Sequence, residues 1–190
     1  MNQAKFVFLD RDGTINVRPP TRCYVTSREG FTFLPRAIDA MKLLASSGYS
    51  IILVTNQAGV GRGLMSESDL EDIHRYMAEE LEKEGVELLD IFACTDSHDS
   101  GSLRRKPHPT MFYEARDRYS VDLADCFYVG DDNRDMLAAN NAGMKSIFVG
   151  DPDSLTPPGS DAGAPLVCDD LYAAAQLVVN GVHQSPDSVG

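Results

Sequence analysis

Two carboxylates, Asp10 and Asp12, stand one residue apart immediately after the apolar run 6–9. The pair Asp12-Gly13 is also a common turn signal after a strand, so a plain hairpin is the first interpretation to consider. On the other interpretation the two acids do chemistry, because one carboxylate can act as a nucleophile while its neighbour transfers a proton. Residues elsewhere in the chain decide between the two.

Three further apolar runs are followed by polar residues of complementary type. They are Thr55 and Asn56 after the run 50–54, Lys106 after the run 89–94, and Asp131 after the run 126–130, with Asp135 one helical turn later. If these runs are parallel strands, their carboxyl ends lie along one edge of a sheet, and these side chains converge with the two acids. Such convergence favours a site over a hairpin.

Phosphoryl transfer uses this set of groups. Asp10 and Asp131 offer the oxygen ligands that Mg²⁺ prefers, and the metal would let a carboxylate approach a phosphate dianion. Asp10 can then attack phosphorus to form an aspartyl-phosphate, while Asp12 protonates the departing alkoxide and later activates water. Thr55 and backbone N–H groups can bond the phosphoryl oxygens, and Lys106 can offset the charge that develops during transfer.

The pattern of the whole chain predicts a fold that can assemble such a site. Strands are expected at 5–9, 50–54, 89–94, 126–130 and 145–149, with a weaker one at 165–168, and helices at 35–47, 66–84, 109–119, 133–142 and 170–179. Continuous apolar strands that alternate with helices are typical of a doubly wound, Rossmann-like α/β fold, with helices on both faces of a parallel sheet. We expect one domain over residues 1–182, a loop at 151–165, and a flexible tail at 183–190.

Composition limits the possible partners. The 190 residues are 43% hydrophobic and 24% charged, as in a globular domain, and the formal net charge is −12. Because an acidic chain lacks the basic face that nucleic-acid backbones require, we expect no nucleic-acid partner. No apolar run reaches membrane-spanning length, and the four cysteines have no paired spacing, so we expect a cytoplasmic protein without membrane contact. A small phosphate ester is the expected partner.

Four short motifs, DRDGT, the TN after the second strand, RKP and GDDNRD, resemble in order the motifs of the haloacid dehalogenase (HAD) superfamily of phosphatases. The resemblance implies that Asp10 is the nucleophile and Asp12 the general acid and base. It also implies that Thr55 and Lys106 position the phosphoryl group. With four motifs at four strand ends, the hairpin-only interpretation loses its support.

The same resemblance implies a Mg²⁺ site. The metal would be held by the side chains of Asp10 and Asp131 and by the backbone carbonyl of Asp12, with Asp135 orienting its water shell. All of these are oxygen ligands, as a hard divalent cation prefers.

Longer segments narrow the resemblance. The stretches DRDGTIN, 24–25, 31–34, TNQAGVGRG and RKPHPTM are similar to those of the D-glycero-D-manno-heptose 1,7-bisphosphate phosphatases, whose subgroup also contains histidinol phosphate phosphatases. This implies a capless, monomeric enzyme that removes the 7-phosphate of the heptose bisphosphate, with histidinol phosphate or another sugar phosphate as the alternative substrate. Two alternatives of other classes are a non-catalytic binding protein, which the intact motifs disfavour, and a nucleic-acid end phosphatase, which the acidic charge disfavours.

Substrate choice would then depend on the loops 15–33, 57–65 and 95–106. By resemblance Arg105 contacts a second phosphate or the sugar, and Asn56 is expected to contact the substrate as well. Arg62, in the glycine-rich GVGRG stretch, is either a contact to an anionic leaving group or an exposed loop residue. Arg104 and His74 are expected to be solvated.

The loop before RKP departs from the family pattern. Family members usually carry a structural zinc there, held by a Cys-x-His pair and a Cys-x-Cys pair. Here the loop reads CTDSHDSGSLRRKP, with Cys94 and His98 at a different spacing and with Ser102 and Leu103 in place of the second cysteines. Because a closed zinc site needs four ligands, we expect no structural zinc. We expect the loop to be held by its brevity, by Gly101 and by the prolines beyond it.

Overall fold

The computed structural model describes residues 4–20, 23–156 and 164–181 of the chain. Its centre is a six-stranded sheet in the order β3-β2-β1-β4-β5-β6, in which every neighbouring pair of strands is parallel. The strands are β1 (Lys5–Leu9), β2 (Tyr49–Asn56), β3 (Leu88–Cys94), β4 (Phe127–Gly130), β5 (Lys145–Val149) and β6 (Leu166–Cys168). All six lie where the apolar runs predicted them, so the expected doubly wound α/β fold is confirmed.

Six α-helices are present in the described part of the chain: α1 (Ala37–Ser46), α2 (Ala58–Gly61), α3 (Glu67–Lys83), α4 (Thr110–Tyr119), α5 (Asn133–Asn141) and α6 (Leu171–Asn180). Short 3-10 turns lie at Arg28–Gly30, Leu123–Asp125 and Pro152–Ser154. Five of the helices match the sequence prediction, whereas α2, a single turn that overlaps the start of the GVGRG stretch, was not predicted. At the start of α3, Ser66 and Asp69 bond each other's backbone N–H groups, which satisfies donors that a helix leaves free.

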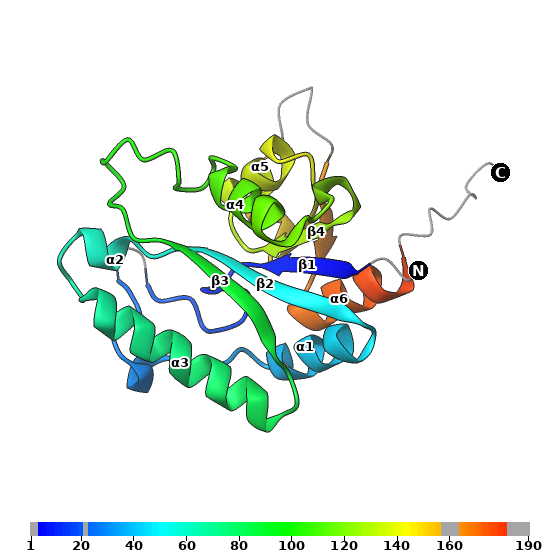
Figure 1. Cartoon of the computed structure of the whole chain (residues 1–190), viewed down its shortest axis with the longest axis horizontal. Helices are drawn as coiled ribbons and strands as arrows, with labels where there is room; N and C mark the ends of the chain where they lie inside the picture. The colour runs from blue at the N-terminus through cyan, green and yellow to red at the C-terminus, as the bar shows by residue number, and fades with distance from the viewer. Residues whose placement is uncertain (1–3, 21–22, 157–163, 182–190) are drawn as a thin grey trace.

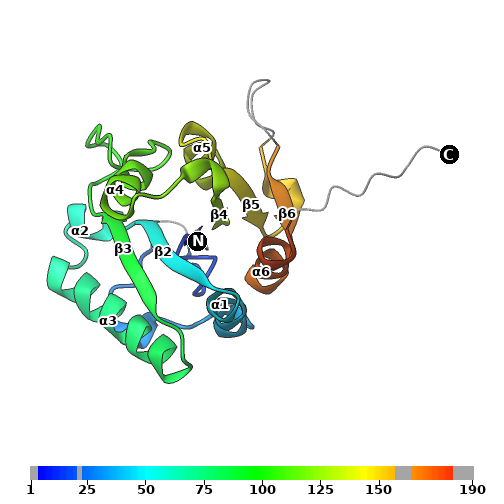
Figure 2. The same ribbon diagram turned by 45° about the vertical axis from the view of Figure 1, so that its right-hand side comes forward.

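The sheet lies between two layers of helices (Figure 1). One face, covered by α1, α3 and α6, buries Val7 and Leu9 of β1, and the other face, covered by α4 and α5, buries Phe8. Successive side chains of a strand point to opposite faces, so a strand buried on both sides needs a continuous apolar sequence. Figure 2 shows β2, β3, β4, β5 and β6 fanned across the molecule between these layers.

The strand order places a crevice at the centre of the sheet. β1 pairs with β2 on one side and with β4 on the other, so the chain reverses the direction in which it adds strands at this point. Ligands bind at such a switch point, outside the carboxyl ends of the strands. Asp10 follows β1 and Asp131 follows β4, so both acids flank the crevice. Gly13, with φ of 89°, brings the first loop so close that a Cβ there would overlap the Asp131 carboxylate.

Two predicted features lie partly or wholly outside the described residues. The expected loop 151–165 contains the 3-10 turn Pro152–Ser154, and its residues 157–163 are outside the described part, as is the expected tail 183–190. Within the described ranges, no helix has both the length and the apolar character needed to cross a membrane.

Candidate active site

Lys106 lies at the centre of the candidate site, in the loop before α4, and its side chain is buried. Its ammonium nitrogen donates to Asp10 Oδ1 at 2.8 Å and lies 2.7 Å from Asp135 Oδ1. It also donates to the Val54 carbonyl at 3.0 Å and to the Tyr128 hydroxyl at 2.6 Å. Burial alone would lower the pKa of Lys106, but the Asp10 and Asp135 carboxylates raise it, so the amine stays charged.

Three carboxylates, those of Asp10, Asp131 and Asp135, each bring one oxygen into a group whose members lie within 4.8 Å of one another. Asp131 Oδ1 is buried and has no hydrogen-bond partner among the described residues. Burial and the Asp10 charge raise the pKa of Asp131 to about 8. Converging acids with an orphaned oxygen fit a divalent cation with hard oxygen ligands, such as Mg²⁺.

Two arginines that the sequence analysis did not single out border these acids. Arg18 donates to Asp131 Oδ2 at 2.9 Å and to Asp132 Oδ2 at 2.6 Å, while Arg134 donates to the two Asp132 oxygens at 2.9 and 2.8 Å. Burial by itself would raise the pKa of Asp132, but the bonds from Arg134 and Arg18 hold it well below its usual range. Asp132 also begins α5, where its N–H donates to the Asp135 carboxylate and so fixes that side chain next to Lys106.

Three donors hold the Asp12 carboxylate. Arg11 Nη2 lies 3.0 Å from both of its oxygens, Asn16 Nδ2 lies 2.9 Å from Oδ1, and Gln57 Nε2 lies 2.8 Å from Oδ2. Burial would raise the pKa of Asp12, but the Arg11 charge and the bonds from Asn16 and Gln57 lower it below its usual value. In the resting site Asp12 is therefore a carboxylate at neutral pH.

The end of β2 supplies Thr55 and Asn56. The buried Thr55 hydroxyl accepts a hydrogen bond from Gln57 Nε2 at 2.9 Å. Asn56 Oδ1 accepts from the Lys106 N–H at 3.1 Å, and Asn56 Nδ2 donates to the Lys106 carbonyl at 3.2 Å. Asn56 thus fixes the backbone of Lys106 beside the strand, and its predicted contact with the substrate stays a prediction.

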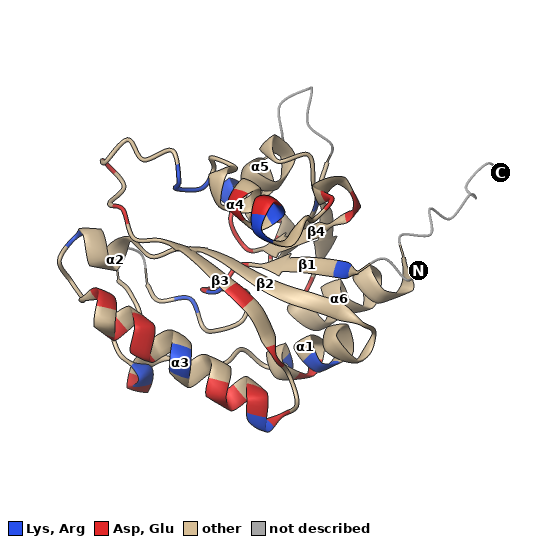
Figure 3. Ribbon diagram, viewed as in Figure 1, with Lys and Arg blue, Asp and Glu red and all other residues tan. Residues whose placement is uncertain are grey.

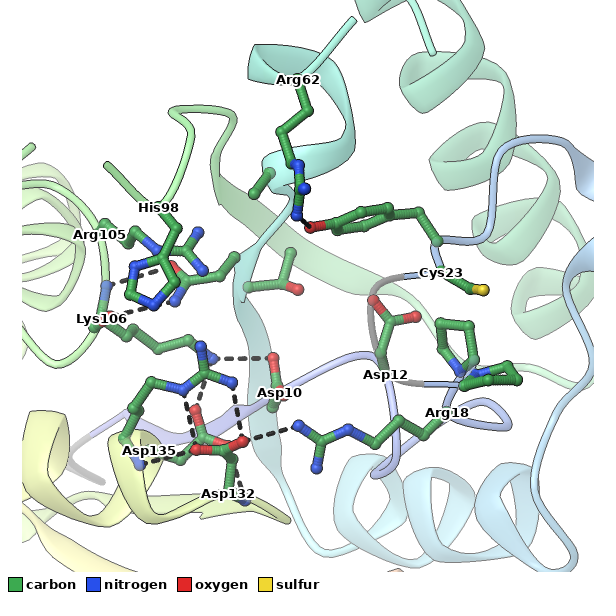
Figure 4. Close-up of a pocket in the computed structure, with 17 residues that line it drawn as sticks. Asp10, Asp12, Arg18, Cys23, Arg62, His98, Arg105, Lys106, Asp132 and Asp135 are labelled. Atoms are coloured by element: carbon green, nitrogen blue, oxygen red, sulfur yellow. Dashed lines mark hydrogen bonds and ion pairs between the residues drawn. The ribbon is translucent and has the colours of Figure 1, made fainter. Parts of the chain in front are cut away.

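A cavity of about 710 Å³ opens at this edge of the sheet. Of the predicted site residues, Asp10, Asp12, Thr55, Asn56, Arg62, Arg105, Lys106 and Asp135 line it, and Asp131 is not among the lining residues. Figure 4 shows Arg18, Arg62 and Arg105 on different sides of the cavity, with the buried Lys106 and Asp10 between them. In a chain of net charge −12 these arginines place positive charge beside the acids that line the cavity. Figure 3 shows a basic stretch on the loop that leads into α4 and acidic residues along α3.

The loop 95–106 is held by side-chain contacts that the sequence analysis did not predict. Arg104, expected to be solvated, is partly buried and pairs with Glu114 of α4 at 2.8 Å. Ser102 Oγ donates to Asp96 Oδ2 at 2.5 Å across the loop. The expectation for Arg104 was wrong because its partner lies ten residues further on, and only the fold of α4 against the loop brings the two together.

The expectation for His74 was also wrong. Its Nε2 lies 3.1 Å from Nη1 of Arg11, which is completely buried and reaches α3 from the loop after β1. Burial and the Arg11 charge lower the pKa of His74 to about 3, so the imidazole is neutral at physiological pH. The charged residues beside His74 on α3 suggested a solvated face, and nothing in the helix sequence indicated a buried arginine beneath it.

Sequence reasoning missed several buried polar residues of the site, among them Arg11, Gln57, Asn16 and Tyr128. The positions of Arg11 and Gln57 could have indicated their burial, because each residue closely follows an apolar strand and lies within a catalytic motif. Tyr128 gave no signal, since a tyrosine inside an apolar strand is usually a core residue.

A switch-point crevice with a lysine-bound carboxylate and a second acid two residues on is the arrangement of HAD phosphatases, and the chain belongs to that class. The sequence profile described as HAD-hydrolase-like matches residues 103–174, a segment that contains Lys106 and Asp131.

Individual relatives identify the family within this class. The D-glycero-beta-D-manno-heptose-1,7-bisphosphate 7-phosphatase of Escherichia coli K12 is 38% identical over 82% of this chain and 84% of its own length. The D-glycero-D-manno-heptose-1,7-bisphosphate 7-phosphatase of Chlorobaculum tepidum is 34% identical over 98% of this chain and all of its own. The crystal structure of the D,D-heptose 1,7-bisphosphate phosphatase from B. bronchiseptica, complexed with magnesium and phosphate, matches with a TM-score of 0.83 and 34% identity, covering 93% of this chain and 98% of that one.

The chain therefore belongs to the D-glycero-D-manno-heptose 1,7-bisphosphate 7-phosphatase family and is a phosphoric monoester hydrolase. The resemblance seen in the sequence is confirmed. Relatives are named for both anomers of the heptose, alpha in Photorhabdus laumondii and beta in Escherichia coli, so their names do not choose between the anomers for this chain.

Proposed function

We propose that this chain is a Mg²⁺-dependent phosphatase that removes the 7-phosphate of D-glycero-D-manno-heptose 1,7-bisphosphate through an aspartyl-phosphate. The observation that carries the proposal is the contact of Lys106 with Asp10, next to the orphaned oxygen of Asp131. A carboxylate can attack a phosphate dianion only where positive charge offsets the repulsion between them. Lys106 supplies such a charge on one side of Asp10, and a cation at Asp131 would supply it on the other.

The residues present support a metal of this kind. The side chains of Asp10 and Asp131 and the backbone carbonyl of Asp12 would hold Mg²⁺, and Asp135 would orient its waters. When bound, the ion supplies Lewis-acid charge that draws the phosphate oxygens toward Asp10.

Asp10 is the nucleophile in this proposal. Lys106 bonds Oδ1, and Oδ2 receives no hydrogen bond within the described part of the chain, so Oδ2 is the oxygen that attacks phosphorus. The bond between phosphorus and the sugar oxygen breaks, and that oxygen keeps the electron pair and takes a proton from Asp12. Asp12 holds this proton once the substrate is bound, because a nearby phosphate dianion disfavours a second negative charge.

The second half of the reaction returns the enzyme to its starting state. Water attacks phosphorus of the aspartyl-phosphate and gives a proton to Asp12, whose carboxylate the donors Asn16 and Gln57 hold in place. The bond between phosphorus and Asp10 breaks, inorganic phosphate leaves, and Asp12 then releases its proton to solvent, which restores the resting carboxylate. Thr55 donates to a phosphoryl oxygen in both halves, and Lys106 balances the charge on Asp10 as its bond to phosphorus forms and breaks.

Two arginines support a substrate with a second anionic group. Arg62 bonds only the Tyr24 hydroxyl at 3.3 Å, and Arg105 bonds only the Asp96 carbonyl at 3.5 Å, so in the described part of the chain neither is paired with a carboxylate. Burial and the neighbouring Arg134 charge lower the pKa of Arg105, so an anion placed here would relieve repulsion between the two guanidinium groups. The 1-phosphate of a heptose bisphosphate is such an anion.

Turnover of a panel of phosphate esters with Mg²⁺ tests the proposal. The panel contains both anomers of the heptose 1,7-bisphosphate, heptose 7-phosphate, histidinol phosphate and p-nitrophenyl phosphate. We expect kcat/KM to be highest for a heptose bisphosphate, with phosphate released from C7. A higher kcat/KM for histidinol phosphate or for a monophosphate sugar would replace the proposed substrate, and no turnover of any ester would remove the proposed reaction.

Variants at the arginines test the second anion site. Arg62→Met and Arg105→Met should raise KM for the bisphosphate roughly tenfold or more, as expected for loss of a charged contact, while p-nitrophenyl phosphate turnover stays within about twofold. Arg28→Gln is the matched control, because Arg28 is exposed and outside the cavity. Equal losses of kcat/KM on both substrates would show that the arginines do not bind the second phosphate.

A further inference from the structure

We propose that Gln57 and His74 are positioning residues that fix, through the buried Arg11, which way the hydrogen bonds run at Asp12 and Thr55. The inference rests on the phosphatase reaction proposed above, in which Asp12 and Thr55 face the substrate. Neither Gln57, His74 nor Arg11 lines the cavity, so each acts on the reaction through another side chain.

Arg11 sets the direction of the whole network. Its side chain is completely inaccessible to solvent, and a guanidinium can only donate hydrogen bonds. Nη2 lies 2.9 Å from Gln57 Oε1 and 3.0 Å from both oxygens of Asp12. The atom of Gln57 that faces Arg11 must therefore be the amide oxygen, because an NH₂ group at that place would meet another donor.

The orientation of the Gln57 amide in turn fixes the direction of the hydrogen bonds at Asp12 and Thr55. With its oxygen turned to Arg11, its NH₂ group donates one hydrogen to Asp12 Oδ2 at 2.8 Å and the other to Thr55 Oγ1 at 2.9 Å. Gln57 is itself fully buried, and its backbone N–H is bonded to the Cys94 carbonyl at 2.7 Å, so the side chain starts from a fixed point. No other orientation of the amide satisfies both Arg11 and Asp12.

The consequence for Thr55 is specific. A hydroxyl has one hydrogen, and because Thr55 Oγ1 accepts from Gln57, that hydrogen is not used toward Gln57. In the described part of the chain Thr55 donates to no protein group, and it lines the cavity, so its hydrogen can be donated to a phosphoryl oxygen. If Gln57 were an acceptor at this place, the Thr55 hydrogen would turn away from the substrate.

His74 fixes the other end of Arg11. Since Arg11 Nη1 donates, His74 Nε2 at 3.1 Å must accept, which requires a neutral imidazole with its hydrogen on Nδ1. The lowered pKa of His74 agrees with that state. His74 comes from α3, 63 residues along the chain, and this bond holds the guanidinium plane in the orientation that serves Asp12 and Gln57.

Substitutions at Gln57 test the direction of the bonds. Gln57→Leu removes both donors, and Gln57→Glu keeps the shape but replaces the donors with acceptors. With p-nitrophenyl phosphate and Mg²⁺, both should lower kcat by roughly 10²-fold, the usual effect of losing an aligned donor to a transferring group. Both should also weaken binding of orthovanadate, measured by calorimetry, which reports on the Thr55 donor without turnover.

A double-mutant cycle shows whether Gln57 acts through Thr55. Thr55→Val removes the hydroxyl, and Gln57→Leu should then cost much less in the Thr55→Val background than in the wild type. Multiplicative losses would mean that Gln57 does not act through Thr55 and would overturn this part of the inference.

Two variants of His74 test the hydrogen bond between His74 and Arg11. This test remains decisive even where a Gln57 variant fails to fold. His74→Gln places an acceptor oxygen near the position of Nε2, and His74→Leu removes the acceptor. We expect kcat within about twofold of wild type for the first and roughly tenfold lower for the second, with KM changed little in either. Glu71→Gln, an exposed change on the same helix, is the control.

The outcomes separate this inference from the proposed reaction. Equal kcat for His74→Gln and His74→Leu, or losses that appear only in KM or only in melting temperature, would assign these residues a structural role and overturn it. If wild-type protein hydrolyses no ester, the proposed reaction itself fails. If wild type is active and the Gln57 variants keep its rate, only the positioning role is removed.

Discussion

Lys106 Nζ lies 2.8 Å from Asp10 Oδ1 across 96 residues of sequence, and both side chains are almost fully buried. The same ammonium group contacts Asp135, so one cation faces two carboxylates with a third, Asp131, nearby. Breaking a buried ion pair from one side leaves an uncompensated charge. Lys106 keeps Asp135 as a partner when Asp10 alone loses its charge, so a substitution of Asp10 that keeps shape and removes charge tests the chemistry with little effect on stability.

Asp10→Asn is that substitution. The amide keeps an oxygen for Lys106 but cannot attack phosphorus, so kcat should fall by about three orders of magnitude or more. Stability should change little, because the loss of the ion pair with Lys106 is offset by less repulsion from Asp131 and Asp135. Steady-state turnover and a thermal melt in EDTA measure the two effects. A variant that retains more than a tenth of the wild-type rate would rule out Asp10 as the nucleophile.

The metal prediction follows from the three converging acids. Activity should disappear in EDTA and return with Mg²⁺, while Ca²⁺ should inhibit, because it takes more oxygen ligands at longer distances in a looser geometry. Mg²⁺ should also raise the melting temperature, because burial and the Asp10 charge disfavour the ionised form of Asp131 and a bound cation would offset both effects.

Asp131→Asn provides the control for the metal. It removes one proposed ligand charge while leaving Asp10 and Lys106 in place, so the Mg²⁺ concentration for half-maximal activity should rise. Full activity in chelator, or an unchanged Mg²⁺ requirement in the variant, would contradict the proposed site.

The parts of the site that the sequence predicted are those tied to strand ends. Asp10, Thr55 and Asp131 follow continuous apolar runs, and a parallel sheet leaves no choice about where such residues gather. Lys106 lies further from its strand; the order of strands and helices placed it near this edge of the sheet, and the RKP motif then supported that placement by resemblance. The strand pattern alone therefore fixes the position of the crevice and much of its chemistry.

The parts that escaped prediction are contacts between segments far apart in the chain. His74 looks like a surface residue on a charged helix, and Arg104 looks like a surplus charge beside the catalytic lysine. Their partners, Arg11 and Glu114, are reached only when α3 and α4 pack against the loops. The local sequence does not indicate such pairs, because each of the two side chains could equally well be exposed and hydrated by itself.

His74 makes stability depend on pH in a direction that can be measured. Its pKa is lowered to about 3 in the folded protein by burial and by Arg11, whereas in the unfolded chain it is near 6.5. Above pH 6.5 both states are neutral at this residue, so it adds no pH dependence there. Between pH 6.5 and 3 the unfolded chain binds a proton that the folded protein does not, and the free energy of unfolding falls, by about 1.4 kcal/mol per pH unit at most.

Denaturant unfolding of the wild type and of His74→Gln at pH 7.5 and pH 5 isolates this effect, with Arg11 and Asp12 present in both proteins. We expect the wild type to lose more stability than the variant on acidification, because the variant has no titrating group at this position. An equal loss in the two proteins would show that His74 titrates normally and is not buried against Arg11.

The last prediction concerns the loop 95–106, which we expect to be stable without structural zinc. From Ala93 to Lys106 the chain offers only Cys94 and His98 as nitrogen or sulfur ligands, and Cys94 Sγ lies 3.6 Å from Asp96 Oδ2. The ion pair of Arg104 with Glu114 links this loop to α4. Arg104→Met should therefore lower the free energy of unfolding by roughly 1 kcal/mol, a value kept small because the pair is partly exposed. Arg116→Met, on the exposed side of α4, is the control and should have little effect.

Elemental analysis of protein purified without added metal should find well under one zinc per chain, and a zinc-selective chelator should leave the melting temperature unchanged. One tightly bound zinc per chain, with a lower melting temperature after its removal, would show that the loop is held by metal after all.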